Sequence, residues 1–328
     1  MDWECVEKSY GLKIQQIEKV RNAYKLNTDK GPKCIKKAHA SPNYFLFVFS
    51  ALEHLIQRGF YGAIAYDRTV DGDICMVEDE YIYYMLSWVE SRQCRFKKEE
   101  ELKSAIKTAA HLHITSEGFI PPENSKPRVH YGKWPERFNK RCSDIKGFKE
   151  TIEGKTRWDS FDKEYYPLIE YYLKQGYEAI ELLLNSPYTD ICEESKRKGQ
   201  FCHHDMAEHN FLITPNGDMK IIDFDYCIMD TRLHDLASLI IRNMKRGIWD
   251  IDKAYFILNE YSKYNPIDSK DLEVIKYFMI FPQDFWQIGL QYYVEKQPWT
   301  MENFLSRLDV TRNDKDLRHS FLEKFSKI

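Results

Sequence analysis

The pattern of apolar and polar positions divides the chain into two parts, and the first ninety residues carry the short-period signals of strands. Three stretches there run apolar or alternate with polar residues: 63–67, 74–77 and 81–86. The segments 17–26 and 33–37 flank turn residues at 28–32 and predict a hairpin. Apolar spacing predicts a helix over 43–58 that ends at Gly59, because glycine often follows a helix end. The sequence therefore predicts a small sheet with one helix.

From about residue 90 onward, the spacing changes to that of helices. Apolar residues recur every three or four positions over seven segments: 98–115, 135–152, 158–183, 233–246, 250–264, 269–293 and 301–326. The region 116–133 contains three prolines and two glycines and predicts a loop. We therefore expect an α+β protein with a boundary near residues 87–91, which separates a sheet-containing lobe at 1–88 from a helical lobe at 89–328.

Composition narrows the classes of function. The chain has 328 residues, of which 43% are hydrophobic, so it can build a sizeable core. Its formal net charge of −3 provides no basic field to attract nucleic acid or an anionic membrane, and no apolar run reaches the ~18 residues of a membrane span. The eight cysteines contain no C-x-x-C pair and predict neither a zinc knuckle nor a disulfide framework. With no signal-like N-terminus, we expect synthesis and retention in the cytoplasm.

The segment from Phe201 to Asp225 carries the candidate chemistry. Asp205 stands five residues before Asn210, and Asp223 follows Asp205 by eighteen residues. Apolar stretches on both sides of the turn at 216–217 predict two short strands that bring these residues together. Phosphoryl transfer needs a carboxylate to orient or deprotonate the attacking hydroxyl, and oxygen ligands to hold magnesium against the phosphates. Asp205 is the candidate catalytic residue, and Asn210 and Asp223 are the candidate metal ligands.

These motifs resemble those of a known superfamily. The sequence H-x-D-x-x-x-x-N at 203–210, followed by Asp223, is similar to the catalytic and metal loops of aminoglycoside phosphotransferases and choline kinases, distant relatives of protein kinases. Further segments resemble the CotS-type spore-coat branch of that superfamily: KCIKK at 33–37, GKWP at 132–135, FPQDFW at 281–286 and the tyrosine pair at 292–293. The resemblance implies a bilobal protein-kinase-like fold that binds ATP and Mg²⁺.

The resemblance also implies a nucleotide site in the first lobe. Lys36 matches the strand lysine that neutralises the α- and β-phosphates, with Lys37 as the alternative if the register is shifted by one residue. The segment from Ser87 to Glu90 matches the hinge whose backbone, at Ser87 and Val89, would meet the adenine edge. The hairpin at 19–24 contains no glycine, however, and side chains such as those of Arg21 and Tyr24 stand where a phosphate loop needs bare backbone. We therefore expect ATP binding to be weak.

Other residues take supporting roles in this interpretation. His203 matches a residue that braces the catalytic loop through backbone hydrogen bonds, while His204, at a position where phosphotransferases often have glycine, and His209 are expected to line the cleft. Asp235 matches the aspartate that opens a helix and ties it to the catalytic loop. The alternative is an exposed aspartate at a helix start, where its charge interacts favourably with the positive end of the helix dipole. The lysine's usual glutamate partner is not obvious, because Glu53 lies about one turn late on its helix. The aromatic residues at 278–293 are expected to pack in the core of the helical lobe.

Three functions are compatible with these residues. The first is a phosphotransferase that uses Mg-ATP to phosphorylate a hydroxyl of a small-molecule acceptor and is associated with the spore coat. The second is a non-catalytic, kinase-shaped component of the coat, whose partners would be other coat proteins. The third reads His203, His204, Asp205 and His209 as transition-metal ligands of a phosphohydrolase, although four residues of one loop cannot close such a site without distant ligands. The acceptor cannot be identified from the sequence.

Overall fold

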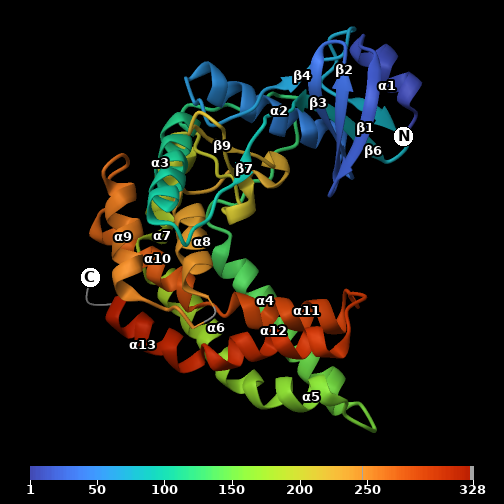
Figure 1. The fold of residues 1–328 in the computed structure, drawn as a ribbon. Helices are drawn as coiled ribbons and strands as arrows, with labels where there is room; N and C mark the ends of the chain where they lie inside the picture. The colour runs from blue at the N-terminus through green and yellow to red at the C-terminus, as the bar shows by residue number, and fades with distance from the viewer. Residues whose placement is uncertain (246, 326–328) are drawn as a thin grey trace. The chain divides into compact units, whose positions relative to one another are not determined.

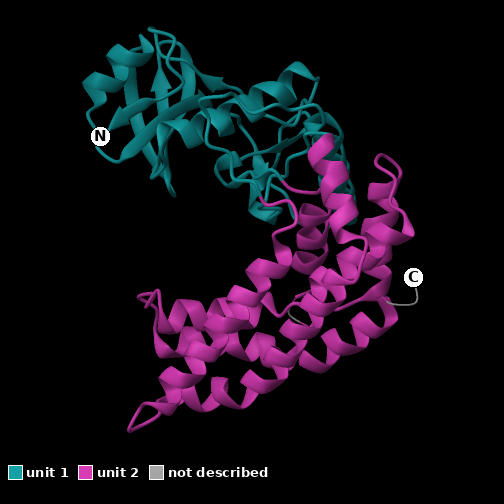
Figure 2. Cartoon of the chain, turned by 180° about the vertical axis from the view of Figure 1, so that it is seen from behind, with its two compact units in different colours: residues 1–129, 198–229 teal, residues 130–197, 230–328 magenta. Residues whose placement is uncertain are grey.

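The computed structural model describes residues 1–245 and 247–325, which form an α+β structure (Figure 1). The chain groups into two compact units, which Figure 2 colours separately: unit 1 holds residues 1–129 and 198–229, and unit 2 holds residues 130–197 and 230–328. Unit 1 thus contains the whole predicted first lobe together with the catalytic segment. The predicted lobe boundary at residue 88 lies inside this unit, so the division into two lobes stays a prediction.

Unit 1 is built on an antiparallel sheet at the start of the chain (Figure 1). Its order is β1-β2-β3-β6-β4, and β5 also pairs with β6. The strands are β1 (Ile14–Val20), β2 (Ala23–Thr28), β3 (Gly31–Ala38), β4 (Tyr66–Asp67), β5 (Met76–Glu78) and β6 (Tyr81–Ser87). Alternation along β3 sends Ile35 into the core beside Val6 and Tyr10 of helix α1 (Trp3–Tyr10), while Lys36 faces the opposite side of the sheet.

Helix α2 (Pro42–Gln57) covers that opposite side. It begins where the Ser41 side chain accepts a hydrogen bond from the Tyr44 amide and where a proline occupies the first turn. It ends before Gly59, whose φ of 82° is the left-handed conformation typical of a helix end. The ring of Phe45, on this helix, packs against the ring of Tyr84, with the ring centres 4.8 Å apart. The predicted helix at 43–58 is confirmed.

The rest of unit 1 carries the catalytic segment. Helix α3 (Glu99–Ser116) is followed in the sequence by the predicted loop, and a second sheet has the order β7-β8-β9. Its strands are β7 (Arg92–Gln93), β8 (Phe211–Ile213) and β9 (Met219–Ile221). The turn between β8 and β9 contains Gly217 at a φ of 86°, so the predicted strands on both sides of this turn are confirmed.

Unit 2 is helical and is held together by aromatic side chains. Its helices are α4 (Trp134–Glu153), α5 (Ser160–Tyr165), η1 (Tyr166–Leu168), α6 (Ile169–Leu184), α7 (Tyr188–Arg197), α8 (Leu233–Met244), α9 (Ile251–Ser262), α10 (Ser269–Ile280), α11 (Gln283–Tyr293), α12 (Met301–Asn313) and α13 (Lys315–Phe325). Phe285 stacks on Tyr165 at 4.2 Å, and Phe281 stacks on Phe138 at 4.0 Å. The predicted core role of the aromatic segment is confirmed at Phe281 and Phe285, both of which are buried.

Several predicted elements have different limits. The segment 17–26 is two strands, because the chain turns at Arg21 and Asn22. The predicted helices 158–183 and 269–293 are each divided at a proline, Pro167 or Pro282, since proline lacks the N–H that continues a helix. The predicted helix 301–326 is divided at Asp314, and α1 and α7 were not predicted. The predicted ends at residues 246 and 326 lie outside the described residues. No helix in the described part of the chain combines the length and the hydropathy that crossing a bilayer requires.

Candidate functional site

A pocket of about 530 Å³ in unit 1 gathers most of the predicted site residues. Its wall comes from the β1–β2 hairpin, from β3 and β6, from the segment after β6, and from the catalytic segment around β8 and β9. The polar and charged lining residues are Arg21, Asn22, Lys36, Ser87, Ser91, Gln93, His209, Asn210 and Asp223. Apolar and aromatic side chains, among them Val20, Leu86 and Trp88, line the rest. Such a mixture of an apolar wall and a few convergent polar groups is typical of a small-molecule site.

Lys36 is a cation that lines this pocket and contacts two carboxylates. Its Nζ lies 2.7 Å from Oδ1 of Asp223 and 3.5 Å from Oδ2 of Asp225. Burial alone would lower the pKa of Lys36, but the two carboxylates outweigh burial and the pKa is raised, so the side chain is an ammonium. Lys37 is exposed, and its Nζ lies 3.5 Å from the centre of the Tyr81 ring. The predicted register, with Lys36 inward and Lys37 outward, is confirmed.

Asp223 lies two residues after the end of β9 in a left-handed backbone conformation, with a φ of 72°. Burial opposes its ionisation, yet the neighbouring Lys36 ammonium lowers the pKa of Asp223 below its usual value. Burial raises the pKa of Asp225 in spite of the same lysine, and the Asp223 charge adds to this increase. Two carboxylates share one ammonium, and this excess of negative charge suits a cation. The Asp223 carboxylate and the Asn210 amide oxygen are the kinds of ligand that Mg²⁺ prefers, so the residues present fit this metal.

The catalytic loop is tied to the metal loop by hydrogen bonds. Nδ2 of Asn210 donates to Oδ2 of Asp205 at 2.9 Å and to its backbone carbonyl at 3.0 Å. The buried His203 contacts the Ile222 carbonyl through Nε2 at 2.9 Å and accepts from the Asp205 amide at Nδ1 at 3.3 Å. These are the backbone contacts that the brace interpretation of His203 predicts. Asp205 is not among the residues that line the pocket. Its carboxylate is linked to the pocket by the hydrogen bond from Asn210, which does line it.

The two other histidines of the loop differ in position. His204 has a φ of 72°, a left-handed conformation that glycine adopts without strain. His209 is exposed and lines the pocket, as predicted, whereas His204 does not. Both ring nitrogens of His203 are engaged by backbone groups, and the described residues show no cluster of ligating atoms from His203, His204, Asp205 and His209. The structure therefore gives no support to the phosphohydrolase interpretation.

The predicted hinge residues also line the pocket. Ser87 and Val89 both line it, together with Trp88. The Trp88 amide donates to the Pro32 carbonyl at 3.0 Å, and the Ser91 hydroxyl donates to the Val89 carbonyl at 3.0 Å. The first bond ties the segment to β3 and the second lies within the segment. Contact of Ser87 and Val89 with an adenine edge stays a prediction.

The β1–β2 hairpin, which lines the pocket, matches only part of the prediction that its side chains stand where the phosphates would bind. Arg21 lines the pocket and has a φ of 53° in a turn of two residues. Tyr24, in contrast, packs against Trp3 of α1 with ring centres 5.3 Å apart, on the face of the sheet away from the pocket. The expectation that Tyr24 stands in the path of the phosphates is therefore wrong, because the strand alternation between residues 23 and 24 sends it to the opposite face.

The sequence missed the residues that hold Lys36. The glutamate partner of Lys36 was left open, and Glu53, which lies one turn late on its helix, binds Arg68 at 3.1 Å. Instead, the Tyr84 hydroxyl lies 2.6 and 2.8 Å from the two carboxylate oxygens of Asp225, beside Lys36. Tyr84 stands opposite Lys36 in the pairing of β3 with β6. In the sequence, only the alternation of residues within β6 pointed to Tyr84. That signal can be interpreted only when the pairing register of β3 with β6 is known.

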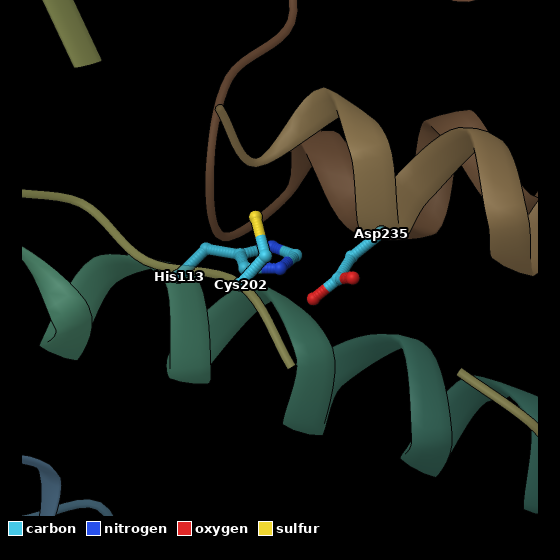
Figure 3. Close-up of side chains that lie close together, drawn as sticks. All are labelled: His113, Cys202 and Asp235. Carbon is cyan, nitrogen blue, oxygen red and sulfur yellow. The ribbon is translucent and has the colours of Figure 1, made fainter. Parts of the chain in front are cut away.

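Asp235 lies in the first turn of α8 and is fully buried. It belongs to unit 2, and its tie to the catalytic loop of unit 1 stays a prediction. In unit 1, His113 of α3 and Cys202, which precedes the catalytic loop, are both buried, with ligating atoms less than 4.8 Å apart (Figure 3).

The chain belongs to the family described as "Spore coat putative kinase YutH", which matches residues 4–325. Spore coat protein S of Bacillus subtilis (strain 168) is 27% identical over 310 residues, which cover 94% of this chain and 88% of that protein. The crystal structure of an aminoglycoside phosphotransferase from Alicyclobacillus acidocaldarius superposes with a TM-score of 0.82 at 21% identity, covering 100% of this chain and 96% of the other.

A second solved structure is similar over nearly the same extent. Spectinomycin phosphotransferase in complex with ADP and spectinomycin superposes with a TM-score of 0.64 at 16% identity, covering 99% of this chain and 97% of the other. At these identities the structural likeness establishes the fold alone. The protein is thus a kinase-fold member of a spore-coat family, as the motifs of the catalytic and aromatic segments predict.

Proposed function

We propose that this member of the spore-coat kinase family is a phosphotransferase that uses Mg-ATP to phosphorylate a hydroxyl of a small molecule. The observation that carries the proposal is the set of polar groups in unit 1, in which Lys36 contacts Asp223 at 2.7 Å and Asn210 contacts Asp205 at 2.9 Å. Asn210, Asp223 and Lys36 line one pocket. This set supplies each group that phosphoryl transfer requires of the protein.

In the proposed reaction, Ser87 and Val89 contact the adenine edge through their backbone, and Lys36 binds the α- and β-phosphates. Asn210 and Asp223 would hold Mg²⁺, which would supply positive charge against the phosphates. Asp205 orients the acceptor hydroxyl and takes its proton as the hydroxyl oxygen attacks the γ-phosphorus. The bond between that phosphorus and the β–γ bridging oxygen breaks, and ADP leaves. Asn210 fixes the Asp205 carboxylate for this task, and His203 supports the loop.

The cellular setting of the proposal comes from the relatives. Because a spore coat protein and an endospore coat-associated protein are similar to this chain, we place the activity in association with the spore coat. The acceptor is a small molecule, as it is for spectinomycin phosphotransferase. Other coat proteins are candidate partners, whereas the weak net charge of −3 gives no reason to expect nucleic acid or a membrane surface as a partner.

A second candidate function, a kinase-shaped coat component without catalysis, is favoured by one observation. Arg21 places a side chain at the pocket where phosphate-binding loops of related folds present glycine backbone. We therefore expect weak nucleotide binding, with a Kd of hundreds of micromolar, roughly −5 kcal/mol.

Calorimetry with Mg-ATP tests the proposal on the wild-type chain and on Asp223→Asn. The substitution removes the metal carboxylate, and Asp218→Asn, in the exposed turn after β8, makes the same change of charge away from the pocket. We expect weak binding that magnesium strengthens, that Asp223→Asn reduces to its level without magnesium, and that Asp218→Asn leaves intact. Absence of binding in all three proteins would refute the phosphotransferase proposal and leave the structural function.

The hairpin can be tested on its own by Arg21→Gly. Glycine suits the φ of 53° at this turn, and it opens the pocket to the backbone. We expect Mg-ATP affinity to rise, by up to about tenfold, or roughly 1.4 kcal/mol. A fall in affinity would show that the Arg21 guanidinium itself binds the phosphates and would refute the idea that it obstructs them.

A further inference from the structure

We infer that Asp225, held in place by Tyr84, positions the Lys36 ammonium, the task that related kinases give to a glutamate of the helix after the lysine strand. The inference rests on the proposed function, because it concerns how Lys36 is presented to the phosphates. Asp225 is here a positioning residue, since it acts through Lys36.

The contacts around Asp225 form a closed set. The Tyr84 hydroxyl lies 2.6 and 2.8 Å from its two carboxylate oxygens, and Lys36 Nζ lies 3.5 Å from Oδ2. The pairing of β3 with β6 puts Tyr84 directly opposite Lys36, so its ring also lies beneath the ammonium, at 5.7 Å. A strand residue thus carries the hydroxyl that fixes the carboxylate at the point where the lysine needs a counter-ion.

The backbone of Asp225 is held as firmly as its side chain. The Tyr44 hydroxyl donates to the Asp225 carbonyl at 2.7 Å, and Nη2 of Arg128 donates to the same oxygen at 3.3 Å. The guanidinium of Arg128 lies over the Tyr44 ring at 4.9 Å, which keeps these two donors together. Because both ends of Asp225 are fixed, its carboxylate has little freedom to leave Lys36.

Helix α2 cannot supply the counter-ion in this chain. Toward the sheet it presents aromatic rings, with Phe45 packed 4.8 Å from Tyr84 and 5.7 Å from Tyr66. Its acidic residue, Glu53, is 44% exposed and paired with Arg68. The space that a helix carboxylate would need is filled with rings, and the carboxylate comes from the metal loop instead. Asp223 also contacts Lys36, at 2.7 Å, but it is the proposed metal ligand, so the inference assigns the positioning of the ammonium to Asp225, at 3.5 Å.

Nucleotide titration by calorimetry tests this division. The variants are Tyr84→Phe and Asp225→Asn, with Lys36→Met as reference and Glu53→Gln as matched control. Tyr84→Phe removes only the hydroxyl and keeps the ring that packs on Phe45. We expect both variants to weaken ATP about tenfold and to leave adenosine, which has no phosphate for Lys36, within about twofold. Glu53→Gln should match the wild type for both ligands.

The same titrations without magnesium separate positioning from metal binding. If Asp225 positions Lys36, the loss of ATP affinity in Tyr84→Phe and Asp225→Asn persists without the metal. If the loss is present only with magnesium, Asp225 is a second metal ligand and the inference is overturned. An equal loss in Glu53→Gln would overturn it as well.

A result in which the wild-type chain binds no ATP would refute the proposed function, and the positioning inference is then decided by a double-mutant cycle on unfolding. The cycle combines Lys36→Met with Asp225→Asn, and a parallel cycle combines Lys36→Met with Glu53→Gln. We expect non-additive effects in the first cycle and additive effects in the second. Additive effects in the first cycle would overturn the inference independently of any nucleotide.

Discussion

Replacing Lys36 with methionine should destabilise unit 1 much more than the same replacement at Lys37. The two lysines are neighbours on β3 and the change of charge and shape is identical, so the comparison isolates the side of the sheet. Lys36 lies between two carboxylates, at 2.7 and 3.5 Å, whereas Lys37 lies over the Tyr81 ring at the surface. Without Lys36, Asp223 and Asp225 are left as neighbouring like charges with no cation.

The expected magnitude follows from the exposure of the groups. The Lys36 side chain is 21% exposed, and those of Asp223 and Asp225 are 31% and 23% exposed. Removing one partner of a fully buried pair costs about 3–5 kcal/mol, and an exposed pair contributes about 0–1 kcal/mol. For this partly exposed group we expect a loss of about 2 kcal/mol for Lys36→Met. For Lys37→Met we expect about 0.5 kcal/mol, the contribution of an exposed cation–π contact.

Urea unfolding at pH 7, followed by far-ultraviolet circular dichroism, measures both variants. The free energies should be compared at unchanged m value, because a change in m would indicate a different unfolding transition. Raising the salt concentration should reduce the small effect at Lys37 more than the effect at Lys36, since salt screens exposed charges most strongly. Equal losses in the two variants, or a larger loss at Lys37, would refute the placement of Lys36 between the aspartates.

Two further substitutions test the fold and its pH dependence. Gly199→Ala should destabilise by about 2 kcal/mol more than Gly217→Ala in urea unfolding; both glycines have positive φ, but only at Gly199 would the added Cβ lie 2.4 Å from a backbone oxygen, that of Phe119. Burial raises the pKa of Asp230 to about 6, so this carboxyl stabilises the folded state below pH 4 and loses that contribution as the pH rises through 6. Asp230→Asn keeps an acceptor for the Trp134 indole N–H, which lies 2.9 Å from the carboxylate. Between pH 4 and 7.5 the wild type should lose about 3 kcal/mol of unfolding free energy through this group, and the variant should not. Parallel curves of unfolding free energy against pH for variant and wild type would contradict this.

Periodicity predicted where elements lie better than where they stop. The pattern of residues 269–293 reads as one helix because α10 and α11 both turn apolar side chains toward the same core, and Pro282 is the only local sign of the break. Helix α1 was missed although its end signals are present: the Asp2 side chain accepts from the Glu4 amide, and Gly11 has a φ of 60°. A helix of eight residues gives too few apolar positions for its period to stand out.

The candidate site shows the same division between local and long-range information. The sequence predicted Asp205, Asn210 and Asp223 because two short strands and one turn connect them. It could not predict the contact of Tyr84 with Asp225, which are 141 residues apart and meet only when β3 pairs with β6 in one register. The partner of Lys36 was left open for the same reason, since the rotation of α2 is set by its aromatic face and not by Glu53, which pairs with Arg68.

The polar groups of this pocket favour a charged ligand over a purely structural role for the fold. Partly burying Lys36, Asp223 and Asp225 costs desolvation, and apolar side chains of similar size would hold the same segments together without that loss. The left-handed backbone at Asp223 adds a strain of up to roughly 1–2 kcal/mol, less for aspartate than for most other residues. A packing module gains nothing from either feature. A site that must hold a metal ion and phosphates gains from both, because the strained turn and the lysine place the carboxylate where the ligand's charge would lie.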